Sequence, residues 1–133
     1  MGVVLKELGQ LEAAVDSYNQ AIEIKPGLAE AYYNRGNALQ VLGQLEAAVD
    51  SYNQAIELQP DLAQAYCNCG NVLTDLGRLE AALDSYDKAI ELQSDLTEAY
   101  YNHGNALQKL GQLEAAVNTN HTMGQLDQNK FSP

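Results

Sequence analysis

Residues Gly9–Glu23 read Gly-Gln-Leu-Glu-Ala-Ala-Val-Asp-Ser-Tyr-Asn-Gln-Ala-Ile-Glu, and the same stretch recurs unchanged at Gly43–Glu57, 34 positions further on. A third version with conservative changes stands at Gly77–Glu91, and a fourth begins again but matches only over Gly111–Val117. A fixed period of this length indicates one supersecondary unit stacked on further units of the same kind. The repeat therefore predicts a solenoid, an architecture that more often provides a binding surface than a catalytic site.

Each repeat unit is expected to fold as two helices. In the second unit the pattern predicts a first helix over Ala29–Leu42 and a second over Leu45–Leu58, both rich in the helix formers Ala, Leu, Gln and Glu. Gly43 stands between them, where glycine can take the left-handed conformation that ends a helix. Pro60 cannot continue the second helix. The chain is thus predicted to be all-α, with stacked antiparallel helix pairs and a 34-residue period.

The period also divides the chain. We expect a truncated unit at 1–28, complete units at 29–62 and 63–96, a partial unit at 97–117, and a degenerate polar tail at 118–133. The residues of a first helix that precede Gly9 amount to about two turns, too few to be stable without packing. Two interpretations of these incomplete ends remain open: a fragment of a longer array, or open ends that pair with other chains in a homo-oligomer.

The composition narrows the range of partners. The formal net charge is −11 and the chain has only 7 Lys and Arg residues, which argues against nucleic acid as a partner. No apolar run approaches the roughly 20 residues that span a bilayer, and no basic-then-apolar leader opens the sequence. Cys67 and Cys69 lie two apart on an expected helix, so their side chains diverge by about 200° and cannot pair. We expect a reduced, cytoplasmic protein.

A known family has the same arrangement of small and aromatic residues. The spacing resembles the tetratricopeptide repeat (TPR) signature, with tyrosine where tryptophan often stands, at Tyr32, Gly36, Leu39, Ala48, Tyr52, Ala55 and Pro60. The resemblance covers Met1 to about Val117, and the sequence of Tyr33–Leu39 resembles that of bacterial members. It implies a right-handed superhelix whose concave wall, lined by first helices, holds an extended peptide or a partner's helix.

The family's concave positions can be transferred onto this sequence, and they form two asparagine ladders with tyrosines beside them. An asparagine amide carries donors and an acceptor, so a ladder can bracket a peptide backbone without reading its side chains. Alternatively, the asparagines tie neighbouring helices together. The candidate groove residues are Glu30, Tyr33, Asn34, Asn37, Gln64, Cys67, Asn68, Asn71, Glu98, Tyr101, Asn102 and Asn105.

The charge of this groove argues against one known TPR function. Family members that grip the acidic tails of heat-shock chaperones use a clamp of lysines and arginines. Here Tyr33, Gln64 and Asn68 stand at those positions, with Cys67 and Glu98 nearby. An acidic tail would meet neutral or acidic side chains, which lowers affinity. The groove is therefore predicted to suit a neutral or basic peptide.

Catalytic chemistry is not indicated. Cys67 and Cys69 without nearby histidines fall short of a four-ligand zinc site, and no catalytic set can be assembled. We predict a non-catalytic adaptor or scaffold that needs no metal or cofactor and binds a peptide segment. Two other functions stay open: a scaffold that assembles through its uncapped ends, and the recognition arm of a larger glycosyltransferase. The second rests on the similar asparagine ladder in the TPR superhelix of O-linked N-acetylglucosamine transferase.

Overall fold

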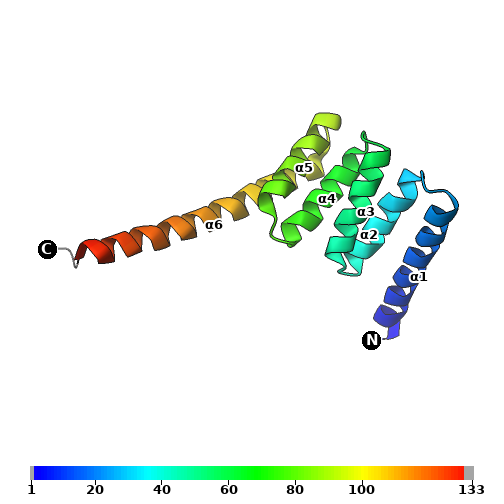
Figure 1. Cartoon of the computed structure of the whole chain (residues 1–133), viewed down its shortest axis with the longest axis horizontal. Coiled ribbons are helices and arrows are strands. Elements are labelled where there is room, and N and C mark those ends of the chain that lie inside the picture. The colour runs from blue at the N-terminus through cyan, green and yellow to red at the C-terminus, as the bar shows by residue number, and fades with distance from the viewer. Residues whose placement is uncertain (1, 131–133) are drawn as a thin grey trace.

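The structure, a computed structural model, describes the backbone of residues 2–130 and the side-chain surroundings of residues 5–117. Within that range every regular element is an α-helix, and the helices follow one another along an elongated stack (Figure 1). The predicted all-α solenoid of stacked helix pairs is confirmed. In chain order the helices are α1 (Gly2–Ile24), α2 (Ala29–Val41), α3 (Leu45–Leu58), α4 (Ala63–Asp75), α5 (Leu79–Leu92) and α6 (Thr97–Lys130).

The two central helix pairs, α2 with α3 and α4 with α5, are closed by glycine turns. Gly43 and Gly77 both have φ of +79°, in the left-handed region that favours glycine. In each turn the residue after the glycine donates its amide back to the preceding helix: Gln44 bonds to the carbonyl of Leu39, and Arg78 bonds likewise to Leu73. The turns therefore fold each second helix back along its first helix.

A tyrosine on each second helix locks the pair together. The rings of Tyr52 on α3 and Tyr86 on α5 are 0% and 1% exposed, and they lie directly over the backbones of Gly36 and Gly70. Any side chain at either glycine would occupy the place of the ring. The sequence pattern of a glycine in the first helix and a tyrosine sixteen positions later is thus a packing contact.

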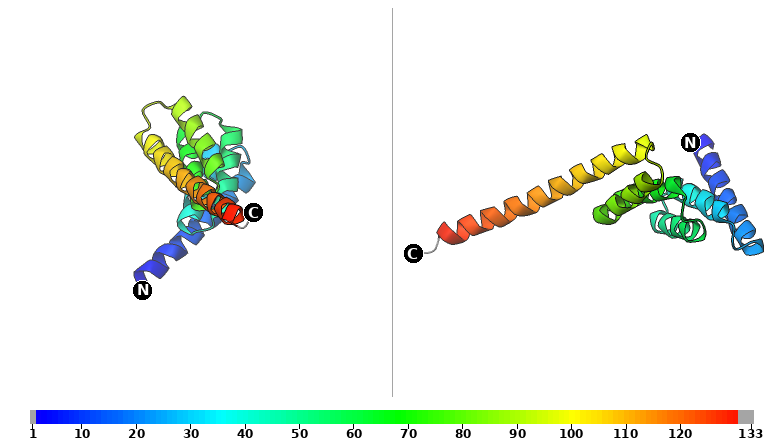
Figure 2. Two further views of the ribbon diagram at one scale, coloured as in Figure 1. Left: turned by 90° about the vertical axis from the view of Figure 1, so that its left-hand side faces the viewer. Right: turned by 90° about the horizontal axis from the view of Figure 1, so that it is seen from above.

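The helix pairs stack so that the first helices form one wall. α2 contacts α4 and α4 contacts α6, whereas α3 and α5 do not approach each other. Because the first helices lie closer together than the second helices, they form the inner side of a curved stack. The two views in Figure 2 show the successive helices rotating about the long axis.

The expectation of two helices in every repeat unit is wrong for the first and last units. α1 runs straight through Gly9, and α6 runs straight through Gly111 to Lys130 (Figure 1). In the last unit Asn120 stands where the other units have Tyr52 and Tyr86, so no aromatic ring is available to hold a folded-back helix on α6. Without that packing contact a turn at the glycine is not stabilised, and the helix continues through it.

The predicted polar tail, 118–133, therefore begins as the continuation of α6. Its last three residues, 131–133, lie outside the described residues. Among the described residues, 2–130, the helices fall short of the length and apolar character needed to cross a bilayer.

Candidate functional site

The inner wall carries the predicted groove residues in three rows, one for each of α2, α4 and α6. Glu30 and Tyr101 are well exposed, the asparagines are mostly half-buried, and the acidic groups lie at the ends of the rows. The structure brings the three rows side by side. Helix α2 carries Glu30, Tyr33, Asn34 and Asn37; α4 carries Gln64, Cys67, Asn68 and Asn71; α6 carries Glu98, Tyr101, Asn102 and Asn105.

Asn37 is a junction between three helices. Its Oδ1 lies 2.6 Å from the hydroxyl of Tyr52, which donates to it from α3. The same oxygen accepts a bond of 3.0 Å from Nδ2 of Asn68 on α4. The Asn68 amide also donates to the hydroxyl of Tyr33 at 3.1 Å. One amide oxygen thus ties the helix pair α2–α3 to the next repeat unit.

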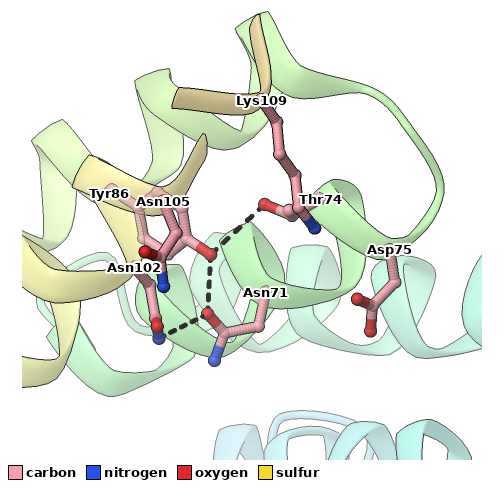
Figure 3. A pocket seen from close by; sticks show the side chains of 7 residues that line it. All are labelled: Asn71, Thr74, Asp75, Tyr86, Asn102, Asn105 and Lys109. Atoms are coloured by element: carbon pink, nitrogen blue, oxygen red, sulfur yellow. Dashed lines mark hydrogen bonds between the residues drawn. The ribbon is translucent and has the colours of Figure 1, made fainter. Parts of the chain in front are cut away.

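The junction at Asn37 recurs 34 residues later at Asn71. Oδ1 of Asn71 accepts from the Tyr86 hydroxyl at 2.6 Å and from Nδ2 of Asn102 at 2.9 Å. Figure 3 shows this arrangement, with the Tyr86 hydroxyl lying also 3.3 Å from Oγ1 of Thr74. The alternative that asparagines tie neighbouring helices together therefore holds for Asn37 and Asn71. Their carbonyl oxygens are occupied by the protein itself.

Helix α6 carries the third position of this ladder, Asn105, which lacks the hydrogen bonds that Asn37 and Asn71 form within the described part of the chain. Among the described side chains neither a tyrosine nor a further asparagine bonds to it, and the residue is exposed. A pocket of about 320 Å³ opens beside it on the inner wall (Figure 3). The pocket is lined by Asn71, Thr74, Asp75, Tyr86, Asn102, Asn105 and Lys109.

The acidic end of the wall is formed by Glu98. Its two oxygens accept bonds of 3.4 Å from Gln64 and from Asn71, both on α4. Gln64 also donates to Oδ1 of Asn68 at 2.9 Å. These contacts hold the carboxylate toward the middle of the wall. A ligand on the wall would therefore meet negative charge beside amides.

The prediction that Cys67 contributes to the groove surface is wrong. The side chain is 0% exposed, because a thiol is much shorter than the tyrosine ring that the other units carry at this position. Cys69 is also buried, and both cysteines are free. Among the described residues no three His, Cys, Asp or Glu side chains gather as a metal site would require. The two cysteines thus belong to the packing between helices.

Both thiols should make the protein less stable in alkali. Burial, and for Cys67 also the charge of Glu98, raises the pKa of each thiol from about 9 to about 11. In the unfolded chain the thiols lose their protons near pH 9, while in the folded chain they keep them. Their contribution to stability is therefore complete below pH 9 and is lost as the pH rises toward 11.

Urea unfolding between pH 7 and 11 tests this prediction. The midpoint should fall above pH 9, and it should fall less steeply in a variant with Cys67→Ala and Cys69→Ala. Tyr52 and Tyr86, whose pKa values burial also raises, remain in both proteins and serve as a common background. Equal slopes in the two proteins would show that the thiols are not responsible.

Two groups that shape the site were outside the predicted set, whereas a third, Lys109, stands at one of the concave positions that the family resemblance indicates. The hydroxyls of Tyr52 and Tyr86 reach the wall from the second helices, and Lys109 lines the pocket from α6. The tyrosines recur with the same period as the asparagines, and this shared period is the signal that links them. Lys109 stands at the concave position that Asp75 occupies in the preceding unit, and Asp75 lines the same pocket.

The fold and its inner wall define an α-helical repeat protein with a groove built from first helices. The sequence matches the TPR repeat over residues 2–43 and 70–111, and the tetratricopeptide repeat over residues 29–62. The chain belongs to the tetratricopeptide repeat family. A comparison with curated protein sequences finds no significant match.

Solved structures of the same architecture are similar over most of the chain. The first TPR of Spaghetti (RPAP3) bound to the HSP90 peptide SRMEEVD is 25% identical, with a TM-score of 0.76 over 83% of this chain and 87% of that one. The crystal structure of MamA is 27% identical, with a TM-score of 0.75 over 97% and 75%. The second TPR domain of human RPAP3, in complex with the HSP70 peptide SGPTIEEVD, is 25% identical, with a TM-score of 0.72 over 79% and 87%.

Proposed function

We propose that this protein is a non-catalytic interaction module that binds a peptide segment or a partner's helix along the inner wall. The observation that carries the proposal is the α6 end of that wall. There Asn105 lines the 320 Å³ pocket, and Tyr101, which is 71% exposed, lies one helical turn before it on the same helix. An exposed aromatic ring next to amide groups suits a peptide, since the ring packs on side chains while the amides bond to its backbone.

The ties at Asn37 and Asn71 narrow the set of residues that would contact a ligand. Because their oxygens accept from tyrosines and from the next asparagine, these two residues act mainly on the shape of the wall. The contacts to a peptide then come from Asn34, Tyr101 and Asn105. Two similar structures were solved with chaperone peptides bound, which supports a peptide as the class of ligand.

The charge on the wall supports a neutral or basic peptide. Glu30, Asp75 and Glu98 are exposed carboxylates on first helices, and Lys109 is the cation of the pocket. The peptides named in the similar structures are acidic, SRMEEVD and SGPTIEEVD. Without a set of lysines or arginines facing the ligand, a tail rich in glutamate would be repelled. The two free cysteines fit a reducing, cytoplasmic location for such a module.

Selection from a random peptide library displayed on phage tests the proposal. Peptides of zero or positive net charge should be enriched, and SRMEEVD should not compete with them. Their affinity should fall by at least about tenfold in a Tyr101→Ala, Asn105→Ala variant, because an exposed aromatic anchor and its amide neighbour are lost. A Glu80→Ala variant, on the second helix α5, is the matched control and should bind as the unchanged protein does.

Enrichment of acidic peptides would contradict the charge argument. Binding that survives the loss of both groove residues would place the ligand elsewhere on the molecule.

A further inference from the structure

Helix α6 has an uncovered face that is covered in the other units. Tyr100 and Leu107 are 51% and 49% exposed, whereas the equivalents of Leu107, Leu39 on α2 and Leu73 on α4, are 6% and 8% exposed. Between them lies Gly104, and no atom of the described chain comes within 4 Å of the position where its Cβ would be. At Gly36 and Gly70 that position is filled by a tyrosine ring. The first half of α6 is therefore a first helix without its second helix.

Helix α1 has the complementary deficiency. It packs on α2 as α3 packs on α4, because Arg35 of α2 bonds to Asn19 of α1 at the positions where Cys69 of α4 contacts Asn53 of α3, so it occupies the place of a second helix. Ala14, Tyr18 and Ala21 nevertheless remain half-exposed, although their equivalents on α3 are fully buried. Of those equivalents, Tyr52 is covered by α2, where its ring lies over Gly36. Helix α1 is thus a second helix without its first helix.

We propose that these two faces bind each other between chains: α1 of one chain docks on α6 of another and completes a helix pair. The template for this contact is the α2–α3 interface inside the molecule. Helix α1 carries the sequence of α3 unchanged over Gly9–Glu23, and α6 carries Ala-Tyr-Tyr-Asn-His-Gly-Asn-Ala-Leu-Gln where α2 has the same residues with Arg for His. The contact between chains would therefore repeat the α2–α3 interface with nearly the same residues.

The polar part of that interface is also present on α6. In the template the Tyr52 hydroxyl lies 2.6 Å from Oδ1 of Asn37 and 3.0 Å from Oε1 of Gln40. The equivalent positions on α6 are Asn105 and Gln108, both exposed. With the ring of Tyr18 placed over Gly104, these two amides would accept its hydroxyl. The same register sets Gly111 against Leu11, where the absence of a side chain gives room for both helices to continue.

The contact joins different chains, because α1 and α6 lie at opposite ends of the stack (Figure 1). An interface between two different surfaces is heterologous, so it leads from dimers to longer head-to-tail chains or rings. The pair Tyr100 and Leu107 lies on the face of α6 that α3 would occupy in the template. The inference therefore goes beyond the groove. It shares Asn105 with the proposed peptide site, and substitutions at Tyr18 and Gly104, which leave Asn105 in place, test it separately from peptide binding.

Light scattering on a size-exclusion column, across a hundredfold range of concentration at 0.15 M salt, tests the proposal. The mass of the unchanged protein should rise in whole multiples of 14.4 kDa. Gly104→Leu fills the open space over Gly104 and should leave the fold of the single chain unchanged. Tyr18→Ala removes the ring that would occupy that space from another chain. Either change should weaken association by at least about tenfold. Leu113→Ala removes an exposed leucine from another face of α6, so this control should associate normally.

Mixing the two variants gives the decisive result. The Tyr18→Ala chain keeps an intact α6 face and the Gly104→Leu chain keeps an intact α1. Equal amounts should therefore form one junction and stop at twice the mass of a single chain. If Tyr18→Ala lowers the helical circular dichroism, Tyr18→Phe replaces it, with a smaller loss that reports the hydroxyl contacts to Asn105 and Gln108. A constant 14.4 kDa, association that survives both changes, or a mixture that stays monomeric would each overturn the proposal.

Discussion

Replacing Tyr86 with alanine should lower the free energy of unfolding by about 3–5 kcal/mol, the range for removing a large aromatic side chain from a core. The ring is 1% exposed, lies over Gly70, and sends its hydroxyl to Asn71 at 2.6 Å. Its loss would leave a cavity between α4 and α5 and remove the donor that fixes Asn71. Since the whole domain is expected to have a stability of about 5–15 kcal/mol, this one change is large.

Urea unfolding followed by circular dichroism measures the effect of Tyr86→Ala. Tyr86→Phe separates the two contributions: it keeps the packing and should cost only about 1 kcal/mol, because Asn71 still accepts from Asn102. Tyr101→Ala is the matched control, since a ring that is 71% exposed should contribute within about 0.5 kcal/mol. A loss under about 1 kcal/mol for Tyr86→Ala would contradict the packing described here.

Gly70→Ala should destabilise the protein by about 1–3 kcal/mol, although alanine is the better helix former by about 1 kcal/mol. A Cβ at this position would lie 2.6 Å from Cε1 and 2.9 Å from Cδ1 of Tyr86. The ring cannot swing aside without breaking the bond of its hydroxyl to Asn71. The helix pair α4–α5 would have to separate instead.

Gly104→Ala is the comparison that decides between packing and helix propensity. It lies at the same place in the repeat unit, but a Cβ there meets no atom of the described chain within 4 Å. At concentrations where light scattering shows single chains, this change should leave stability unchanged or raise it by up to about 1 kcal/mol. The two glycines should thus give effects of opposite sign. Equal effects would mean that the ring of Tyr86 does not determine the cost.

The same tyrosines connect stability to the groove. Because Tyr52 and Tyr86 donate to Asn37 and Asn71, substituting either asparagine alters the packing of a helix pair as well as the wall. A loss of peptide binding in such a variant would have two causes. Among the described side chains, Asn105 accepts a hydrogen bond neither from a tyrosine nor from another asparagine. Its substitution therefore changes the wall without changing the packing of a helix pair, and for that reason it is the residue chosen for the binding test.

Much of this protein could be predicted from its sequence, because a repeat unit contains most of its own contacts. The turn residues Gly43 and Gly77, the bounds of the central helices and the seating of Tyr52 near Gly36 depend on residues within one unit. Helical periodicity was sufficient to assign the candidate groove residues to the first helices. In each case, local backbone preference and side-chain spacing select the same structure.

Other features depend on neighbours that a single unit does not contain. Gly9 and Gly111 have the same surroundings in sequence as Gly43, yet α1 and α6 continue through them, since a turn forms only where a second helix has a tyrosine and a first helix on which to pack. Cys67 is buried at a position expected to face the groove, because its short thiol does not reach past the side chains packed around it. The double use of the Asn37 and Asn71 oxygens likewise appears only once α2, α4 and α6 lie side by side. The sequence alone determines the repeat unit, whereas contacts between units determine where a helix turns, how deep a side chain lies and which amides face solvent.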